Sequence, residues 1–336
     1  MKNLLYIGNH LSDSGKTETT IETLSRSLRQ EGYTVYTVSN KKSKVWRLLD
    51  MLFSILKYAK KVDGVLIDTY STSNFHYAYL CSQLCRVLNL KYIPILHGGN
   101  LPHRLKTHPQ LCKAIFNNAY KNVAPSTYIK AEFEHKGYSN VVYIPNSILL
   151  KNYPFKDRNY ETIKLLWVRS FSEIYNPLLA IRILKALLNE GIQASLCMVG
   201  PDNDGSLLKA KQYASALQVE VHFTGKLPKE DWILLSKTHN IFINTTNFDN
   251  MPVSVIEAMA LGLPVISTSV GGMPFLIENE QNGLLVAPHN ENEFVDAIKK
   301  IQQNPEGTQQ MTLNARKKVE GFDWEAVKSL WISELN

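Results

Sequence analysis

Cysteine is scarce in this sequence, and the cysteines present form no metal-binding or redox pattern. The chain has four cysteines in 336 residues, and none of them is part of a Cys-x-x-Cys motif. Cys81 and Cys85 lie four residues apart, a spacing that places both on one face of a helix. We therefore expect reduced, mostly buried thiols in a cytoplasmic protein, and no disulfide framework.

Long hydrophobic runs are also missing. The opening apolar run, from Leu4 to Gly8, is five residues long, which predicts a buried strand and no secretory signal. No window approaches the roughly 18 to 20 apolar residues that cross a bilayer. With 44% hydrophobic and 20% charged residues, the chain is long enough for two domains with proper cores.

Acidic residues are absent from a long stretch of the first half. Between Asp68 and Glu132 the chain has no acidic residue, although seven Lys and Arg fall there. Residues 1–150 contain 19 Lys and Arg against 9 Asp and Glu, whereas the remainder contains 18 against 21. A basic first half predicts an anionic partner, either a membrane surface or a phosphate-bearing acceptor. We expect no nucleic-acid partner, because no base-stacking or groove-reading motif accompanies the charge.

Strands and helices are predicted to alternate along the chain in two series. The first series of strands is expected at 4–7, 34–38, 64–68, 92–96, 122–124 and 141–144, and the second at 164–168, 194–199, 219–223, 241–244, 264–267 and 283–286. Such alternation is typical of parallel sheets with right-handed crossovers. The predicted fold class is therefore α/β, with two doubly wound, Rossmann-like domains.

A polar segment with two prolines, residues 145–160, is the expected connector between these domains. The predicted boundaries are 1–150 for the first domain, 151–320 for the second and 321–336 for a terminal helix. Further helices are expected, for example over 17–31 and over 293–302. Asn290 and Glu293 form a capping box that predicts the start of the second of these helices.

The first strand is followed by an incomplete nucleotide-binding signature. Gly8 and Gly15 precede Lys16 and Thr17, but six residues separate the two glycines where a P-loop has four. Loop length builds the nest of backbone N–H groups that holds phosphate, so a true P-loop is disfavoured. No Gly-x-Gly-x-x-Gly follows this strand either, which argues against a nicotinamide dehydrogenase. We expect Gly15 to face the cleft between domains. Its lack of a side chain would permit close approach of a substrate, either the donor or the acceptor of a transferred group.

An Asp-x-Asp sequence occurs at 202–204, a pattern that some enzymes use to hold a metal-bound diphosphate. It follows a predicted strand and Gly200-Pro201, and Gly205 comes directly after it. This setting is typical of a solvated turn. We therefore expect no required metal.

The most informative stretch is 248–272, in which residues 248–268 predict a loop, a helix, a turn and a strand. Pro252 suits the first turn of a helix, so Asp249 and Asn250 belong to the loop before it. Gly262 and Pro264 end the helix. The helix start directs unpaired N–H groups into the loop, which makes a binding place for a diphosphate. A purely structural interpretation remains open, in which Asp249 caps the helix and Glu257 complements its dipole.

Residues 257–265 read Glu-Ala-Met-Ala-Leu-Gly-Leu-Pro-Val, and Asp249 lies eight positions before Glu257. This pattern resembles the nucleotide-sugar motif of family 4 retaining glycosyltransferases. Residues 145–147 and the helix near 322–324 resemble further segments of that family. The resemblance implies a GT-B fold, with the acceptor on the first domain, the nucleotide sugar on the second, and a last helix that returns to the first.

Site residues follow from this resemblance. It implies that His97, after a first-domain strand, orients the donor sugar, as does Asp249. Arg169 would grip the diphosphate, and Glu257 would hold the ribose hydroxyls. The remaining donor-binding positions implied are Gly15, Lys226, Asn250, Met251 and Pro252.

The sequence departs from the family pattern on the sugar and phosphate side of the donor. Asp249 stands where the family has Glu, and Asn250 where it usually has Gly. The Lys that normally follows Arg169 about six residues later is missing, and Phe275 replaces an acidic residue. These departures predict altered donor recognition.

Residues 41–61 form a predicted basic amphipathic helix. They contain seven Lys and Arg against one acid, interleaved with large apolar residues. Lys44, Trp46 and Arg47 are the candidate contacts with an acceptor or with an anionic membrane surface. The alternative is a crossover helix packed on the sheet with solvated ends.

The function expected from the resemblance is transfer of a sugar, with retention of configuration, from a UDP- or GDP-type donor to a glycan or lipid-linked acceptor. No cofactor would be required. The expected setting is bacterial surface-polysaccharide, lipopolysaccharide, capsule or glycolipid synthesis, in the cytoplasm and peripheral on the inner face of the membrane. One alternative is a catalytically weakened nucleotide-sugar-binding protein of the same fold, and another is a nucleotide-dependent kinase.

Overall fold

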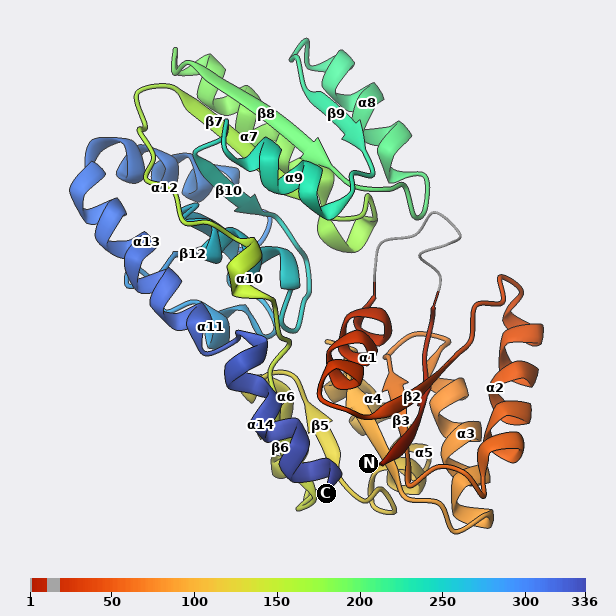
Figure 1. The fold of residues 1–336 in the computed structure, drawn as a ribbon. Helices are drawn as coiled ribbons and strands as arrows, with labels where there is room; N and C mark the ends of the chain where they lie inside the picture. Colours follow the sequence, from red (N-terminus) through yellow and green to blue (C-terminus); the bar gives the residue numbers. More distant parts are fainter. Residues whose placement is uncertain (1, 11–18) are drawn as a thin grey trace. The chain divides into compact units, whose positions relative to one another are not determined.

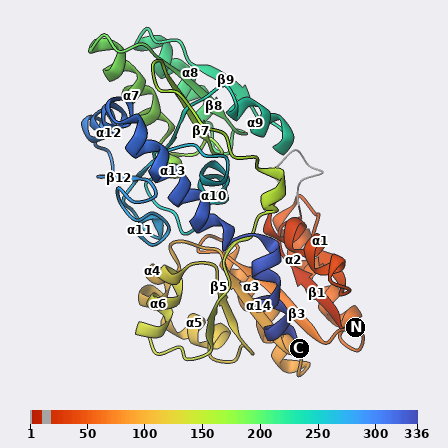
Figure 2. The same cartoon turned by 60° about the vertical axis from the view of Figure 1, so that its left-hand side comes forward.

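The computed structural model describes residues 2–10 and 19–336, so Gly15 lies outside the described residues. The chain divides into two compact units. Unit 1 comprises Met1–Pro145 and Lys328–Asn336, and unit 2 comprises Asn146–Val327. Each unit is built on one six-stranded parallel sheet flanked by helices (Figures 1 and 2). The predicted α/β class with two doubly wound sheets is confirmed.

In unit 1 the strand order is β2-β1-β3-β4-β5-β6. The strands are β1 (Asn3–Ile7), β2 (Thr34–Val38), β3 (Gly64–Thr69), β4 (Tyr92–Leu96), β5 (Asn122–Ala124) and β6 (Val141–Tyr143). The helices are α1 (Thr20–Gln30), α2 (Lys44–Tyr58), α3 (Phe75–Val87), α4 (Leu101–Thr107), α5 (Pro109–Phe116) and α6 (Thr127–His135), with the end of α14 (Trp324–Leu335). Leu5, Ile7 and Ile67 of the sheet pack against Met51 and Ile55 of α2 in one core cluster.

In unit 2 the strand order is β12-β11-β10-β7-β8-β9. The strands are β7 (Ile163–Val168), β8 (Ala194–Val199), β9 (His222–Gly225), β10 (Ile241–Asn244), β11 (Val265–Thr268) and β12 (Leu284–Val286). The helices are α7 (Pro177–Asn189), α8 (Ser206–Ala216), α9 (Lys229–Ser236), α10 (Val253–Ala260), α11 (Met273–Leu276), α12 (Glu291–Gln303) and α13 (Pro305–Glu320). Trp167 on β7 is fully buried in the larger core cluster of this unit.

The strand predicted at 219–223 is displaced in the structure, where β9 begins at His222. Gln218 adopts a positive φ of 53°, and the amide of Val219 donates to the Ala214 carbonyl at 3.1 Å. Residues 218 and 219 therefore close the end of α8 and are not available to the sheet.

Capping explains where α12 starts. The Asn290 side chain accepts a hydrogen bond from the Glu293 amide, as the capping box predicts, and the helix begins at Glu291. The helix therefore begins two residues before the expected 293. Local hydrogen bonds at helix ends decide this boundary and that of β9, and hydrophobic periodicity does not report such bonds.

The strand orders place a switch point in each sheet. In unit 2, β8 lies on one side of β7 and β10 on the other, so the chain reverses its direction of progress there. Open α/β sheets bind ligands outside the carboxyl ends of the strands at such points. The loops after β7 and β10 carry Arg169 and Asp249, and the topology therefore brings these two residues to one place.

Candidate functional site

The loop between β10 and α10 is held by backbone contacts that only glycine permits. The Gly272 amide donates to the Asp249 carbonyl at 2.9 Å. Gly271 has a φ of +53°, and a Cβ atom there would lie 2.1 Å from the Asp249 carbonyl oxygen. A Cβ atom on Gly272 would lie 1.9 Å from the Asn250 carbonyl oxygen. The two glycines thus let a second loop pass directly beneath the residues that precede α10.

The start of α10 presents backbone N–H groups with no side-chain cap. Pro252 is the N-cap residue, in an extended conformation with a φ of −69° and a ψ of 122°. No side chain of the described residues caps this end. The Val255 amide donates to the Pro252 carbonyl at 3.1 Å, and the amides of Val253 and Ser254 have no partner among the described residues. These two N–H groups and the helix dipole together favour an anion.

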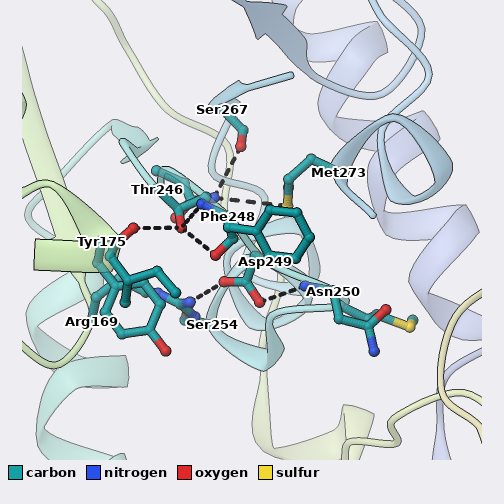
Figure 3. Close-up of polar contacts among 12 residues, drawn as sticks. Arg169, Tyr175, Thr246, Phe248, Asp249, Asn250, Ser254, Ser267 and Met273 are labelled. Atoms are coloured by element: carbon teal, nitrogen blue, oxygen red, sulfur yellow. Dashed lines mark hydrogen bonds and ion pairs between the residues drawn. The ribbon is translucent and has the colours of Figure 1, made fainter. Parts of the chain in front are cut away.

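Arg169 and Asp249 form an ion pair with each other at this helix start (Figure 3). Both side chains are largely buried, with exposed fractions of 11% and 15%. The guanidinium lies over the ring of Tyr175, 3.9 Å from its centroid, and its Nη1 is 3.4 Å from the Ser254 hydroxyl. The arrangement joins one cation, one carboxylate and the helix start within a single cluster.

Glu257 lies in the second turn of α10 and is 3% exposed. Its Oε1 accepts a hydrogen bond from the Tyr153 hydroxyl at 2.6 Å and from the Lys229 ammonium at 2.5 Å. Among the described residues, no hydrogen bond to its Oε2 is found. The carboxylate is therefore fixed by two donors on one oxygen, and the other oxygen keeps its capacity to accept.

Tyr153, Tyr175 and Lys229 belong to this site, although no sequence motif indicates them. Lys229 follows Lys226, a predicted donor-binding residue, by three positions, and Tyr175 lies within the segment that lacks the family Lys. Tyr153 is 104 positions from Glu257 in the sequence, and no motif links them. Proximity to the predicted residues was the available signal for the first two, and none existed for Tyr153.

The other donor-binding positions of unit 2 differ in exposure. Lys226 is exposed between β9 and α9. Asn250 and Met251 are buried, with exposed fractions of 4% and 6%. The Met251 side chain packs in a core cluster, and its carbonyl accepts from the Asn146 side chain at 2.9 Å. The Met251 side chain therefore serves the core, and the donor contact of Met251 stays a prediction.

His97 lies in unit 1, directly after β4. Its Nε2 is 2.8 Å from Oδ1 of Asp68, and that oxygen also accepts from the Tyr6 hydroxyl at 2.9 Å. Oδ2 of Asp68 is buried with no partner among the described residues, and Asp68 lines a cavity of about 10 Å³, room for one water. The ring of Tyr70 stacks on His97 at 5.4 Å. A hydrogen bond to Asp68 thus fixes the imidazole plane.

The three candidates for acceptor or membrane contact separate in the structure. Lys44 and Trp46 are exposed on α2. Arg47 is 7% exposed and donates to the carbonyls of Lys41 and Lys42 and to the Asn9 side chain. The surface role expected for Arg47 is therefore corrected: its guanidinium fastens the loop before α2.

The Asp-x-Asp sequence lies directly before α8 and accepts hydrogen bonds from amides at the start of that helix. Asp202 accepts from the amides of Gly205 and Leu207, and Asp204 accepts from Ser206 and Ser172. Within the residues that the structure describes, no group of three or more His, Cys, Asp or Glu is placed to hold a metal ion. The same part of the chain contains no helix of the length and apolarity needed to cross a bilayer.

Comparison with known proteins agrees with this architecture. Residues 152–318 match the family model described as glycosyl transferases group 1. Over 91 residues the chain is 34% identical to a probable sucrose-phosphate synthase 4 of Oryza sativa subsp. japonica, covering 27% of this chain but only 8% of that protein.

Solved structures match over the whole chain. A sucrose-phosphate synthase from Thermosynechococcus elongatus is 18% identical with a TM-score of 0.83, covering 100% of this chain and 98% of that one. Anabaena HepE in complex with UDP and glucose is 16% identical with a TM-score of 0.81, covering 100% and 99%. At such identities the likeness concerns the fold. The chain therefore has the GT-B fold of glycosyltransferases, and its residues 152–318 match the family model described as glycosyl transferases group 1.

Proposed function

We propose that this protein is a retaining glycosyltransferase that moves a sugar from a nucleoside-diphosphate sugar to a glycan or lipid-linked acceptor. The observation that carries the proposal is the cluster at the switch point of the unit 2 sheet. There the uncapped start of α10, the Arg169 guanidinium and the buried Glu257 carboxylate occur together. This set supplies an anion-binding site, and next to it a carboxylate that can accept hydrogen bonds from hydroxyl groups.

The ion pair between Arg169 and Asp249 gives the donor site a defined first step. A diphosphate at the α10 start competes with Asp249 for the guanidinium, because phosphate oxygens bind the same N–H fork. Release of Asp249 frees its carboxylate to accept hydrogen bonds from hydroxyls of the donor sugar. Arg169 and the helix start then stabilise the charge that develops on the departing diphosphate.

Glu257 is proposed to hold the ribose. Its Oε1 is occupied by Tyr153 and Lys229, so the carboxylate keeps one orientation. Oε2 is the oxygen that would accept from ribose hydroxyls. Lys229 keeps the carboxylate ordered without itself contacting the sugar.

The remaining parts of the proposal concern substrates and place. HepE, which is similar in fold, binds UDP, and this supports a uridine donor over the guanosine alternative. We propose no cofactor and no required metal, with His97 orienting the donor sugar. The acceptor is proposed to be a glycan or lipid-phosphate-linked glycan of surface-polysaccharide or glycolipid synthesis, reached by peripheral association with the inner face of the membrane.

A second candidate function is a nucleotide-sugar-binding protein with weakened catalysis. One observation favours it: Tyr175 packs on Arg169 in the segment where the family has a second cation, so one side chain remains to hold the diphosphate there. Such a protein would bind the nucleoside diphosphate and transfer no sugar.

A thermal-shift panel tests the proposal. The panel contains the diphosphates of uridine, guanosine, adenosine and cytidine with their sugars, each with and without a chelator. We expect the nucleoside diphosphate of one base to raise the melting temperature with or without chelator. The protein should also turn over a nucleotide sugar of that same base. Binding without any donor hydrolysis or transfer would favour the second candidate, and magnesium-dependent turnover of ATP would identify a kinase.

A further inference from the structure

Helix α2 of unit 1 has a hydrophobic face that points away from its own core. Five large apolar side chains are exposed, with fractions of 67% for Val45, 67% for Trp46, 48% for Leu49, 64% for Phe53 and 55% for Leu56. At the angular spacing of an α-helix these five positions fall within an arc of about 100°. The residues buried against the unit, Met51 and Ile55 among them, lie on the opposite side. The helix therefore satisfies its core with one face and leaves an apolar stripe on the other.

The surroundings of the stripe are cationic. Exposed lysines flank it at both ends: Lys41, Lys42, Lys44, Lys57, Lys60 and Lys61. The one acidic residue of this segment, Asp50, is partly buried and accepts from the Ser39 hydroxyl at 2.5 Å. Helix α3, which packs beside α2 in the same core cluster, has no acidic residue (Figure 1).

We propose that this face of α2 is a membrane-docking surface that inserts its apolar stripe into a bilayer leaflet with anionic lipid headgroups. The stripe, from Val45 to Leu56, is about 17 Å long, and an interfacial helix of this kind buries its apolar face about 5–10 Å deep. The lysines at both ends reach the headgroup phosphates while their methylene stems stay at the apolar boundary. The inference deepens the proposed function and rests on it for the lipid-linked acceptor.

The charges favour a bilayer over a second copy of the chain. A two-fold dimer would place the same patch on itself, and six lysines would then face six lysines with no exposed carboxylate of α2 to pair with them. An anionic leaflet offers both the apolar phase and the opposite charge. The occupant that fits both features is therefore the membrane.

Trp46 supplies a direct probe of insertion. Of the five tryptophans of the chain, Trp167, Trp232, Trp324 and Trp331 are at most 4% exposed, whereas Trp46 is 67% exposed. We expect vesicles of phosphatidylcholine with phosphatidylglycerol to shift the emission of the full chain to shorter wavelength. Acyl-brominated lipids should quench it. Vesicles of phosphatidylcholine alone should do neither, and Trp46→Phe should still float with anionic vesicles but lose the emission shift.

A paired variant tests the stripe itself by flotation. Trp46→Ser with Phe53→Ser should lower partition into anionic vesicles by at least about tenfold, since two buried aromatic side chains are lost. Lys42→Gln and Lys60→Gln should each lower it about fivefold. The matched control, Leu208→Ser with Leu234→Ser, removes two exposed leucines of unit 2 and should partition as the unaltered chain does.

Three results would overturn the proposal. They are no partition into anionic vesicles at low salt, equal partition of the paired variant, or a dimer in sedimentation velocity that the paired variant abolishes. The nucleotide panel on the same samples separates this inference from the proposed function. Vesicle binding without any nucleotide-induced stabilisation would refute the donor site and support the docking surface. Nucleotide-induced stabilisation without vesicle binding would refute the docking surface alone.

Discussion

At the scale of single residues, Asp249 serves two partners in turn. In the structure it neutralises Arg169, and in the proposed complex it contacts the donor sugar. Asp249→Asn removes the competing carboxylate, so affinity for the bare nucleoside diphosphate should stay the same or rise. Turnover of the nucleotide sugar should fall by at least about tenfold, or about 1.4 kcal/mol in activation free energy. Calorimetry and donor turnover on the same variant check both parts, and equal losses in both would rule out sugar contact.

Glu257 carries the prediction for nucleoside recognition. Glu257→Ala should weaken donor binding at least about tenfold, or about 1.4 kcal/mol, because the ribose loses its acceptor. Glu257→Gln is the control, since it keeps the shape and one acceptor oxygen and should lose less. Unchanged donor affinity of the alanine variant in calorimetry would remove Glu257 from the donor site.

The sequence predicted these residues unevenly, for physical reasons. Glu257 and Asp249 lie in one local motif, so spacing along a single helix start relates them. Tyr153 and Lys229 reach Glu257 through tertiary packing, and no local pattern records such a contact. The mutual pairing of Arg169 with Asp249 was not predicted, because both were assigned only to the donor.

At the scale of elements, the passage of residues 271 and 272 beneath the α10 loop sets the site geometry. Gly271→Ala places a Cβ atom against the Asp249 carbonyl at a φ of +53° and should destabilise the protein by at least about 2 kcal/mol more than Gly205→Ala. Gly205 also has a positive φ, of +84°, but a Cβ atom added there would have no described atom within 4 Å. Gly205→Ala therefore measures the cost of a positive φ without a steric clash. Urea unfolding of both variants measures the difference, and equal destabilisation would show that the close contact is unimportant.

The strands were largely predictable because buried parallel strands are short, continuous apolar runs between turn residues. The displaced β9 was not, because hydrogen bonds at the end of α8 decide where that strand begins. Helix α2 was expected from its amphipathic pattern. The direction of its apolar face required the structure, because periodicity alone does not say which side faces the core.

At the scale of the whole molecule, the two sheets have separate tasks in this account. Unit 2 provides the anion site and the Glu257 carboxylate that would accept hydrogen bonds from the ribose. Unit 1 provides His97 and the basic surface of α2. The strongly basic first half of the sequence corresponds to unit 1. The charge asymmetry therefore agrees with a division between donor recognition and attachment to an anionic surface.

The central claim is that the start of α10 and Arg169 together bind the β-phosphate of a nucleoside diphosphate. Calorimetric titration of the preferred nucleoside as its monophosphate and diphosphate tests it most directly, in the unaltered chain and in Arg169→Met. We predict that the diphosphate binds at least about tenfold tighter than the monophosphate in the unaltered chain, and that Arg169→Met removes most of this difference. Equal affinity for the two nucleotides, or the same preference in Arg169→Met, would contradict the account.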